Sequence, residues 1–242
     1  MTKRLRSEMG SSTADRIVVR GQDLNALIGS VGLGAMAFLE LKGRLPSDQE
    51  LAVFEAILVA LVEHGMTPSA IATRMTYLGA PESVQAAVAA GLLGLGGRFG
   101  GTVEDAARML QEGGSAEVIV AAYRARKLAV PGLGHPIHKP IDPRVPRLFE
   151  VAAANGFSGR FVVLMNQVSE AATQVLGKPL PVNATGAIGA LASELDIPWR
   201  VSRGLAVIAR AVGLVGHLQE EIEEPLASEI WTRVDEEVSK RE

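Results

Sequence analysis

The apolar pattern along the chain predicts a protein built almost entirely of helices. Ser47 precedes a long apolar run and Glu50 follows three residues later, which is the spacing of a capping box. We expect a helix from there to about His64, where Gly65 would end it. Because this helix is apolar nearly all round, it should lie buried at the centre of the fold. A second helix should start at Thr67-Pro68, with a cap and a proline in the first turn.

Further helices are predicted where a capping residue precedes an Ala- and Leu-rich or amphipathic run. Their expected ranges or starts are 82–95, 102–110 and 116–127, then near Arg147, Arg160, Gly186, Pro198 and Leu226. The helix over 102–110 would open on an acidic variant of the capping box. Only residues 15–20, with two adjacent valines, indicate a short strand. The pattern therefore predicts an all-α fold.

The helical pattern breaks at residues 130–146, which hold five prolines and cannot form a regular helix. A shorter break, GKPLPVN, follows at 177–183. A long irregular stretch inside a compact domain is usually functional. The sequence therefore directs attention to the loop over 130–146.

This loop carries residues suited to binding an anion. Gly132 and Gly134 would let the backbone approach a ligand and offer N–H groups to it. His135 can give or take a proton. Lys139 and Arg144 can present positive charge. A rigid connector with surface charges is an equally good interpretation of these residues taken alone.

Composition narrows the possible chemistry. The 24 Lys and Arg against 27 Asp and Glu give a net charge of −3, so we expect no nucleic-acid partner. The absence of cysteine excludes disulfides, thiol nucleophiles and thiolate metal sites. Four histidines remain for proton transfer near neutral pH: His64, His135, His138 and His217. His135 and His138 have the spacing of a His-x-x-His metal site. Because Pro136 keeps this segment off a helix and no third ligand is evident, we expect no metal.

The sequence favours a cytoplasmic protein. The N-terminus is basic, but no apolar segment follows it, so residues 1–15 are expected to form a flexible arm rather than a secretory signal. The most apolar stretches carry charges, Glu55 and Glu63 in one and Arg210 in another, so no membrane span is expected.

Arg210 is the only charge in the apolar segment GLAVIARAVGLVGHL. A buried guanidinium needs an anionic partner, either a protein carboxylate or a substrate carboxylate. His217 lies two turns further on the same face and is interpreted as a core residue. His64 either caps the helix that it ends or emerges from it into a cleft. The run GLLGLGGRFGGT is a Gly-rich loop that could bind a phosphate or allow tight packing, and Arg98 within it could face an anion or solvent.

Several segments, in this order, resemble the citrate synthase superfamily, in particular its short citryl-CoA lyase branch and the C-terminal lyase module of ATP-citrate lyase. They are VVRGQDLNALIG (18–29), GRLPSDQEL (43–51), VEHG (62–65), GGRFGG (96–101), PGLGHPIHKPIDPR (131–144), PVNATGAIGAL (181–191) and IARAVGLVGHLQEE (208–221). The resemblance implies a citrate synthase-like helical fold with a large domain and a small mobile domain. Residues 16–99 and 186–242 would form the discontinuous large domain, and 100–185 the small CoA-binding domain.

The resemblance also implies a coenzyme A thioester as substrate. Coenzyme A would lie on the backbone of Gly132, Leu133 and Gly134, with Lys139 and Lys178 near its phosphates. An acyl-CoA and a 2-oxo dicarboxylate would be the small-molecule partners, and the protein would form a homodimer or higher homo-oligomer. The tail after Pro225 keeps several apolar residues and is expected to dock on a partner subunit.

The same resemblance assigns catalytic and substrate-binding roles. His135 matches the histidine that acts on the keto or hydroxyl oxygen of the substrate, and His64, Arg144 and Arg210 match residues that hold the dicarboxylate. Thr185 stands where the family motif NVDG supplies an aspartate that moves the proton at the acetyl carbon. A threonine hydroxyl alone is not a competent general base, and the loss of such help costs on the order of 10²–10⁴ in rate.

A second position also departs from citrate synthases. Phe99 in GGRFGG replaces their histidine that polarises the thioester carbonyl, whereas the lyase branch also has RFGG. The sequence thus favours a citryl-CoA lyase-like enzyme that cleaves citryl-CoA, or a similar 3-hydroxy-3-carboxyacyl-CoA, to acetyl-CoA and oxaloacetate, or runs the reverse condensation. The alternatives are a related CoA-ester lyase or synthase for another 2-oxo acid, and a catalytically silent CoA-binding paralogue.

Overall fold

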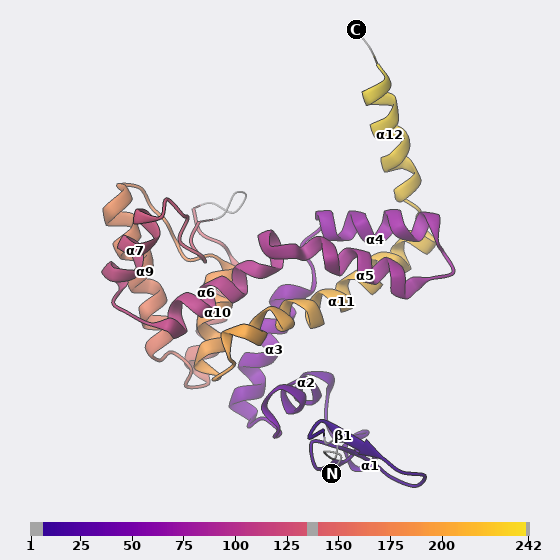
Figure 1. Ribbon diagram of the computed structural model, residues 1–242, viewed down its shortest axis with the longest axis horizontal. Coiled ribbons are helices and arrows are strands. Elements are labelled where there is room, and N and C mark those ends of the chain that lie inside the picture. The colour runs from indigo at the N-terminus through magenta and orange to yellow at the C-terminus, as the bar shows by residue number, and fades with distance from the viewer. Residues whose placement is uncertain (1–6, 135–139, 241–242) are drawn as a thin grey trace, which may run out of the picture.

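The computed structural model describes residues 7–134 and 140–240 (Figure 1). Its elements are β1 Gly10–Ser12, β2 Ile17–Val19, β3 Gln22–Asp23, α1 Leu24–Leu27, α2 Leu33–Lys42, α3 Asp48–Val62, α4 Pro68–Gly79, α5 Val84–Leu95, the π-helical turn η1 Gly96–Gly100, α6 Gly101–Glu112, α7 Ala116–Ala125, α8 Arg144–Ala154, α9 Arg160–Leu176, α10 Ala184–Glu194, α11 Trp199–Glu223 and α12 Ala227–Ser239. The predicted all-α fold is confirmed. The predictions for His135 and Lys139 lie outside the described residues.

The short strand expected at 15–20 is present as β2. It pairs antiparallel with β1, with Val18 opposite Ser11, and with β3, with Val19 opposite Gln22. The strand β1 falls within the segment predicted to be an arm. Neither β1 nor β3 has an apolar alternation, so the sequence pattern carried no signal for them.

The capping box of α3 is confirmed, but the predicted burial of the whole helix is wrong. Ser47 Oγ accepts the Glu50 N–H at 3.2 Å, and the Glu50 carboxylate accepts the Ser47 N–H at 2.9 Å. Phe54 and Ile57 are fully buried, whereas Val59 is 73% exposed. The reason is that α2, α8, α10 and α11 cover only part of the helix, and the rest of its apolar surface lies open in the single chain.

The Gly-rich run does not form the predicted loop, and Thr102 does not cap a helix. The elements α5, η1 and α6 follow one another without a loop, and the backbone departs from helical dihedrals at Gly96, which has a φ of +46°. Thr102 Oγ1 donates to the Phe99 carbonyl oxygen inside this path. Glycine can distort a helix without ending it, and π-helical turns are frequent at functional sites. The turn places Arg98 and Phe99 on its exposed side.

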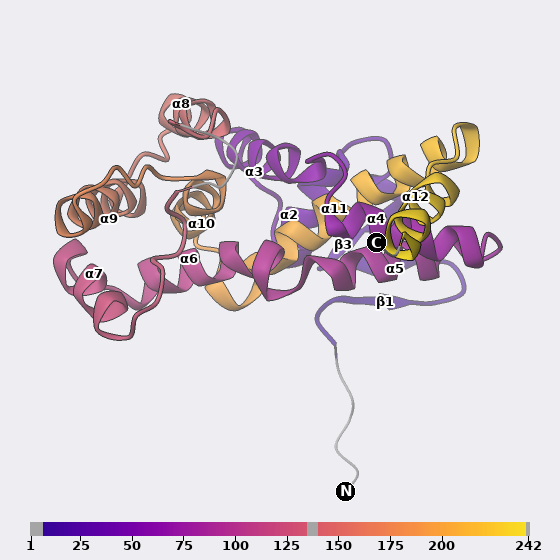
Figure 2. The same cartoon turned by 90° about the horizontal axis from the view of Figure 1, so that it is seen from above.

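The helix α11 runs through the molecule and joins its two ends (Figure 1). It packs against α3, α4, α5, α6 and α10. One end is built by α6, α7, α8, α9 and α10, and the other by α4, α5 and the start of α12, as Figure 2 also shows. The division into a large and a small domain stays a prediction. The last helix, α12, projects away from the body (Figure 1).

Two helical segments, Val84–Glu112 and Trp199–Glu223, are long and apolar enough to cross a membrane by length and composition. Length and composition alone also select the core helices of proteins that never enter a membrane. Both segments pack against neighbouring helices here.

Candidate active site

A cleft of about 620 Å³ lies where α3, η1, the 130–146 loop, α10 and α11 meet, a size typical of small-molecule sites. Five of the predicted catalytic and binding residues line it: His64, Gly134, Arg144, Thr185 and Arg210. The predicted CoA contact Lys178 is not among the lining residues and lies exposed on the turn after α9. The fold therefore brings the predicted dicarboxylate-binding residues together from three separate parts of the chain.

The Gly-rich part of the loop is fixed to the strand-like segment before α10. Gly134 N–H donates to the Pro181 carbonyl at 2.8 Å, and Asn183 N–H donates to the Gly132 carbonyl at 2.9 Å. The Asn183 side chain donates to the Gly134 carbonyl at 2.6 Å. These bonds hold residues 132–134 beside the cleft. Because the Gly134 N–H already donates within the protein, a ligand would have to bind to a neighbouring part of the loop backbone.

Asp142 is a buried residue beside the cleft whose contacts the sequence reasoning missed. It is 1% exposed, and its carboxylate accepts the Arg144 Nε–H at 3.0 Å, the Arg144 Nη2–H at 2.8 Å and the Ala184 N–H at 3.0 Å. Burial raises the pKa of Asp142, but the hydrogen bonds from Arg144 and the backbone outweigh it and hold this pKa well below its usual range. The carboxylate thus orients Arg144 and caps α10. Only the Asp-Pro-Arg spacing hinted at this role.

Thr185 faces the cleft from the first turn of α10. Its hydroxyl donates to Asn183 Oδ1 at 2.8 Å, and the same oxygen accepts the Gly186 N–H at 3.1 Å. The hydroxyl proton is therefore engaged, and the free lone pairs of Thr185 Oγ1 can only accept a hydrogen bond. The residue can orient a ligand or a water, but it cannot replace an aspartate as a base.

Arg210 projects from the buried face of α11 towards the cleft and is 7% exposed. Its Nε and Nη1 atoms have no hydrogen-bond partner within residues 7–134 and 140–240. Burial lowers the pKa of Arg210, and the nearby charge of Glu63 only partly offsets this. Since unpaired buried donors cost about 1–3 kcal/mol, the site is poised for an anion. Of the two partners open at the sequence level, this favours a ligand carboxylate.

The described lining of the cleft carries positive but no carboxylate side chains. Arg98 of η1 joins Arg144, Arg210 and His64, while Phe99, Met66 and Pro68 add apolar surface. The sequence left Arg98 open between solvent and an anion, and the π-helical turn brings it into the cleft lining. Such a site suits a ligand with more than one carboxylate and an apolar part.

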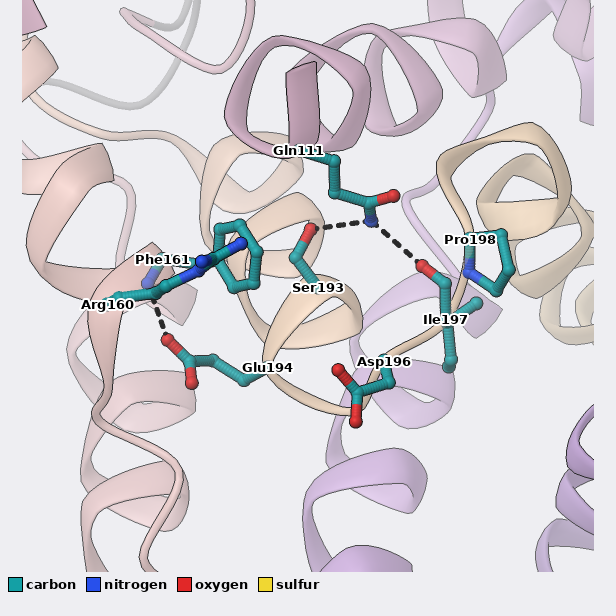
Figure 3. Close-up of a pocket in the computed structure, with 8 residues that line it drawn as sticks. All are labelled: Gln111, Arg160, Phe161, Ser193, Glu194, Asp196, Ile197 and Pro198. Atoms are coloured by element: carbon teal, nitrogen blue, oxygen red, sulfur yellow. Dashed lines mark hydrogen bonds between the residues drawn. The ribbon is translucent and has the colours of Figure 1, made fainter. Parts of the chain in front are cut away.

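A second hollow, shown in Figure 3, lies between α6, α9 and the end of α10. Gln111 donates to Ser193 Oγ and to the Ile197 carbonyl, each at 2.9 Å. Glu194 accepts the Phe161 N–H at 2.6 Å and so caps α9. These polar groups already serve the fold. In the described part of the chain, no cluster of three or more His, Asp or Glu residues could hold a metal ion.

The fold and the cleft define an all-α protein in which three arginines and a histidine line one cleft. The family model for the C-terminal domain of citrate synthase matches residues 35–231. The chain therefore belongs to the citrate synthase family, as the sequence motifs indicated.

The chain is similar to known members of two kinds. The structure of citryl-CoA lyase from Hydrogenobacter thermophilus is 36% identical, with a TM-score of 0.87, and the match covers 99% of this chain and 91% of that one. The ATP citrate lyase of Methanothrix soehngenii, solved with citrate and coenzyme A, is 25% identical with a TM-score of 0.79, over 92% of this chain and 39% of that one.

Among curated proteins, ATP-citrate synthase beta chain protein 1 of Arabidopsis thaliana is 28% identical over 202 residues, 74% of this chain and 33% of the relative. The chain thus spans about a third of the length of the first curated relatives that it matches. The likeness to citryl-CoA lyase, in contrast, extends over nearly the whole of both chains.

Proposed function

We propose that the protein is a citryl-CoA lyase-like enzyme. The observation that carries this proposal is the buried guanidinium of Arg210, whose Nε and Nη1 have no hydrogen-bond partner among the described residues. It lies in a cleft lined by two further arginines, in a chain that is similar to citryl-CoA lyase over nearly its whole length. The substrate would be citryl-CoA or a similar 3-hydroxy-3-carboxyacyl-CoA. Cleavage would give acetyl-CoA and oxaloacetate, and the reverse condensation would use the same groups.

In the proposed cleavage, His135 takes the proton of the substrate hydroxyl. The bond between the hydroxyl-bearing carbon and the methylene carbon beside the thioester then breaks. The hydroxyl-bearing carbon becomes the ketone of oxaloacetate, and the electron pair remains on the acetyl unit as an enolate, which takes up one proton to give acetyl-CoA. Arg144, Arg210 and His64 hold the carboxylates during these steps, with Arg144 oriented by Asp142.

Coenzyme A, as part of the substrate, would lie along Gly132, Leu133 and Gly134, with Lys139 and Lys178 near its phosphates. The bridge between Leu133 and Val182 fixes this segment beside the start of α10. A coenzyme A thioester bound along this segment would place its acyl group in the cationic cleft. No bound metal is part of the proposed reaction.

The test is to incubate the protein with citryl-CoA and to follow oxaloacetate through its reduction by malate dehydrogenase, with acetyl-CoA measured separately. We expect equal amounts of both products and their loss in His135→Ala. Intact binding of coenzyme A without any turnover of citryl-CoA would overturn the substrate assignment.

Thr185 supports a second candidate, a lyase or synthase for a different 2-oxo acid. Its hydroxyl is bonded to Asn183 and cannot perform the aspartate's proton transfer. A panel of 2-oxo acids with acetyl-CoA and longer acyl-CoAs would distinguish the two, since exclusive use of oxaloacetate and acetyl-CoA rejects the second candidate. A large gain of lyase activity in Thr185→Asp would instead indicate a decayed, CoA-binding paralogue.

We also propose that the chain forms a homo-oligomer through its open apolar surfaces. Trp231, Val234 and Val238 of α12 are 60%, 57% and 78% exposed and form a stripe at helical spacing. A lone 13-residue helix is marginal in water, so a helix that projects from its own body needs a partner surface. Light scattering at micromolar concentration is expected to give a dimer or larger species, and a monomer would contradict this.

A further inference from the structure

A cluster of charged groups surrounds the buried side chain of Arg74, and the proposed reaction does not use it. Arg74 of α4 is 1% exposed and is the largest fully buried side chain among the described residues. Its Nη1 donates to Glu221 at 2.7 Å, its Nη2 donates to Glu220, and its Nε donates to His217 Nδ1 at 3.3 Å. Because a guanidinium has no acceptor, Nδ1 of His217 must be the acceptor. Neutral His217 then carries its proton on Nε2.

That Nε2 atom points at the end of α3, next to the cleft. It lies 3.1 Å from Glu63 Oε2, which is an ion-pair distance, although the angle is not that of a hydrogen bond. The other oxygen, Glu63 Oε1, accepts the N–H groups of His64 at 2.8 Å and of Gly65 at 2.5 Å. One carboxylate therefore connects His217 to the backbone that carries His64.

The backbone packing makes this connection tight. A Cβ built on Gly213 of α11 would stand 2.1 Å from the Val62 carbonyl oxygen and 3.2 Å from Glu63 Oε2. Only glycine thus lets the end of α3 rest on α11 at this point. Arg210, Gly213 and His217 lie on one buried face of α11, one turn apart. The face that presents Arg210 to the cleft also supports the segment that carries His64.

We infer that His217 and Glu63 act as positioning residues that set the place of His64 against the dicarboxylate end of the substrate, with Arg74 holding His217 in the required tautomer. This inference rests on the proposed function, since it concerns the same cleft. Neither residue touches the ligand itself. The imperfect angle between His217 and Glu63 fits a contact that tightens when the ligand binds.

A matched pair of variants tests the connection. His217→Asn keeps an acceptor near the position of Nδ1 for Arg74 but removes the donor that faces Glu63. His217→Gln keeps a donor that reaches Glu63. Glu63→Gln keeps an oxygen for the N–H groups of His64 and Gly65 and turns an amide N–H towards His217. Because the Glu63 side chain is 45% exposed, this last variant breaks the link from the other side with little risk to folding.

The measurement is calorimetric binding of oxaloacetate and, separately, of coenzyme A, with thermal melting as a check of folding. We expect His217→Asn and Glu63→Gln to weaken oxaloacetate binding roughly tenfold, the effect of one lost hydrogen bond, while coenzyme A affinity stays within about twofold. His217→Gln should bind oxaloacetate nearly as the wild type does. A purely structural role would move both affinities, or neither.

The result is read against His64→Ala. If the wild type binds both ligands and His64→Ala weakens oxaloacetate, the proposed site stands, and unchanged oxaloacetate binding in His217→Asn and Glu63→Gln overturns the inference alone. Equal weakening of both ligands together with a lower melting temperature also overturns it. Wild-type protein that binds neither ligand would contradict the proposed function itself.

Discussion

Gly186 in the first turn of α10 lies directly against Gly132 of the 130–146 loop. A Cβ on Gly186 would stand 2.4 Å from the Gly132 carbonyl oxygen, and a Cβ on Gly132 would stand 2.5 Å from the Gly186 Cα atom. Gly132 also has a φ of +80°, which favours glycine. The contact joins the proposed coenzyme A loop to the helix that carries Thr185. The geometry of the cleft therefore depends on both residues being glycine.

Gly186→Ala should therefore damage both stability and function. We expect a loss of roughly 1–3 kcal/mol in the free energy of unfolding, as for other overpacked sites, and a weaker affinity for coenzyme A. Urea unfolding and calorimetry measure the two effects. The control is Gly216→Ala on the exposed side of α11, where a Cβ would meet no atom within 4 Å. It should leave binding unchanged and stabilise the helix by up to about 1 kcal/mol, and equal losses in both variants would contradict the packing argument.

Asp142→Asn should loosen Arg144 and the start of α10 together. The carboxylate accepts from both, and a hydrogen bond to a charged group is worth roughly 1.5–3 kcal/mol, so we expect a loss of at least this size in unfolding free energy. The variant should also bind oxaloacetate more weakly, because Arg144 loses its orientation. The ion pair between Arg147 and Glu150, which lies on α8 with Arg144, offers a control. Glu150→Gln there breaks an exposed ion pair and should change neither quantity measurably.

The ionised carboxylate of Glu50 should stabilise the fold, and this stabilisation should be lost in acid. The hydrogen bond from Arg44 is the main cause that holds the pKa of Glu50 at about 2, against an ordinary value of 4.5. Since this pKa is lowered in the folded state, its stabilising effect is complete above about pH 4.5 and is lost as the pH falls towards 2.

Urea unfolding at pH 6 and pH 3 checks this. The wild type should lose more stability between the two pH values than Glu50→Gln, which has no charge to titrate. Ser47→Ala removes the cap at both pH values, at a cost of about 1 kcal/mol, and should leave the difference between them intact. Identical acid losses in wild type and Glu50→Gln would show that this carboxylate is not responsible.

The sequence predicted those parts of the fold that local interactions decide. Ser47 and Glu50 define the start of α3 through contacts within four residues, and the prolines of the 130–146 loop exclude a helix by sterics alone. The π-helical turn at Phe99 was missed because glycines can either end a helix or distort it, and packing makes the choice. Asp142 was missed because its partner at the start of α10 is distant in the chain.

The residues of the candidate site also fall into two groups, those that the sequence alone could single out and those that tertiary packing brings together. Arg210 could be singled out because one charge in an apolar helix is visible in the sequence. That His64, Arg144 and Thr185 line the same cleft follows from tertiary packing, and only the family motifs anticipated it. The buried contacts of Arg74 gave no sequence signal, since a lone arginine in α4 looks like a surface residue.

Arg210 offers the sharpest separation of function from stability. In the protein without ligand its guanidinium is buried with unpaired Nε and Nη1 atoms among the described residues, so Arg210→Met should raise the free energy of unfolding by roughly 1–3 kcal/mol. The same change removes two hydrogen bonds that Arg can make to a substrate carboxylate, so we expect kcat/KM for citryl-CoA to fall about a hundredfold or more. Arg200→Met, at an exposed position of the same helix, is the matched control and should do neither. Lower stability in Arg210→Met would mean that the arginine supports the fold rather than a ligand.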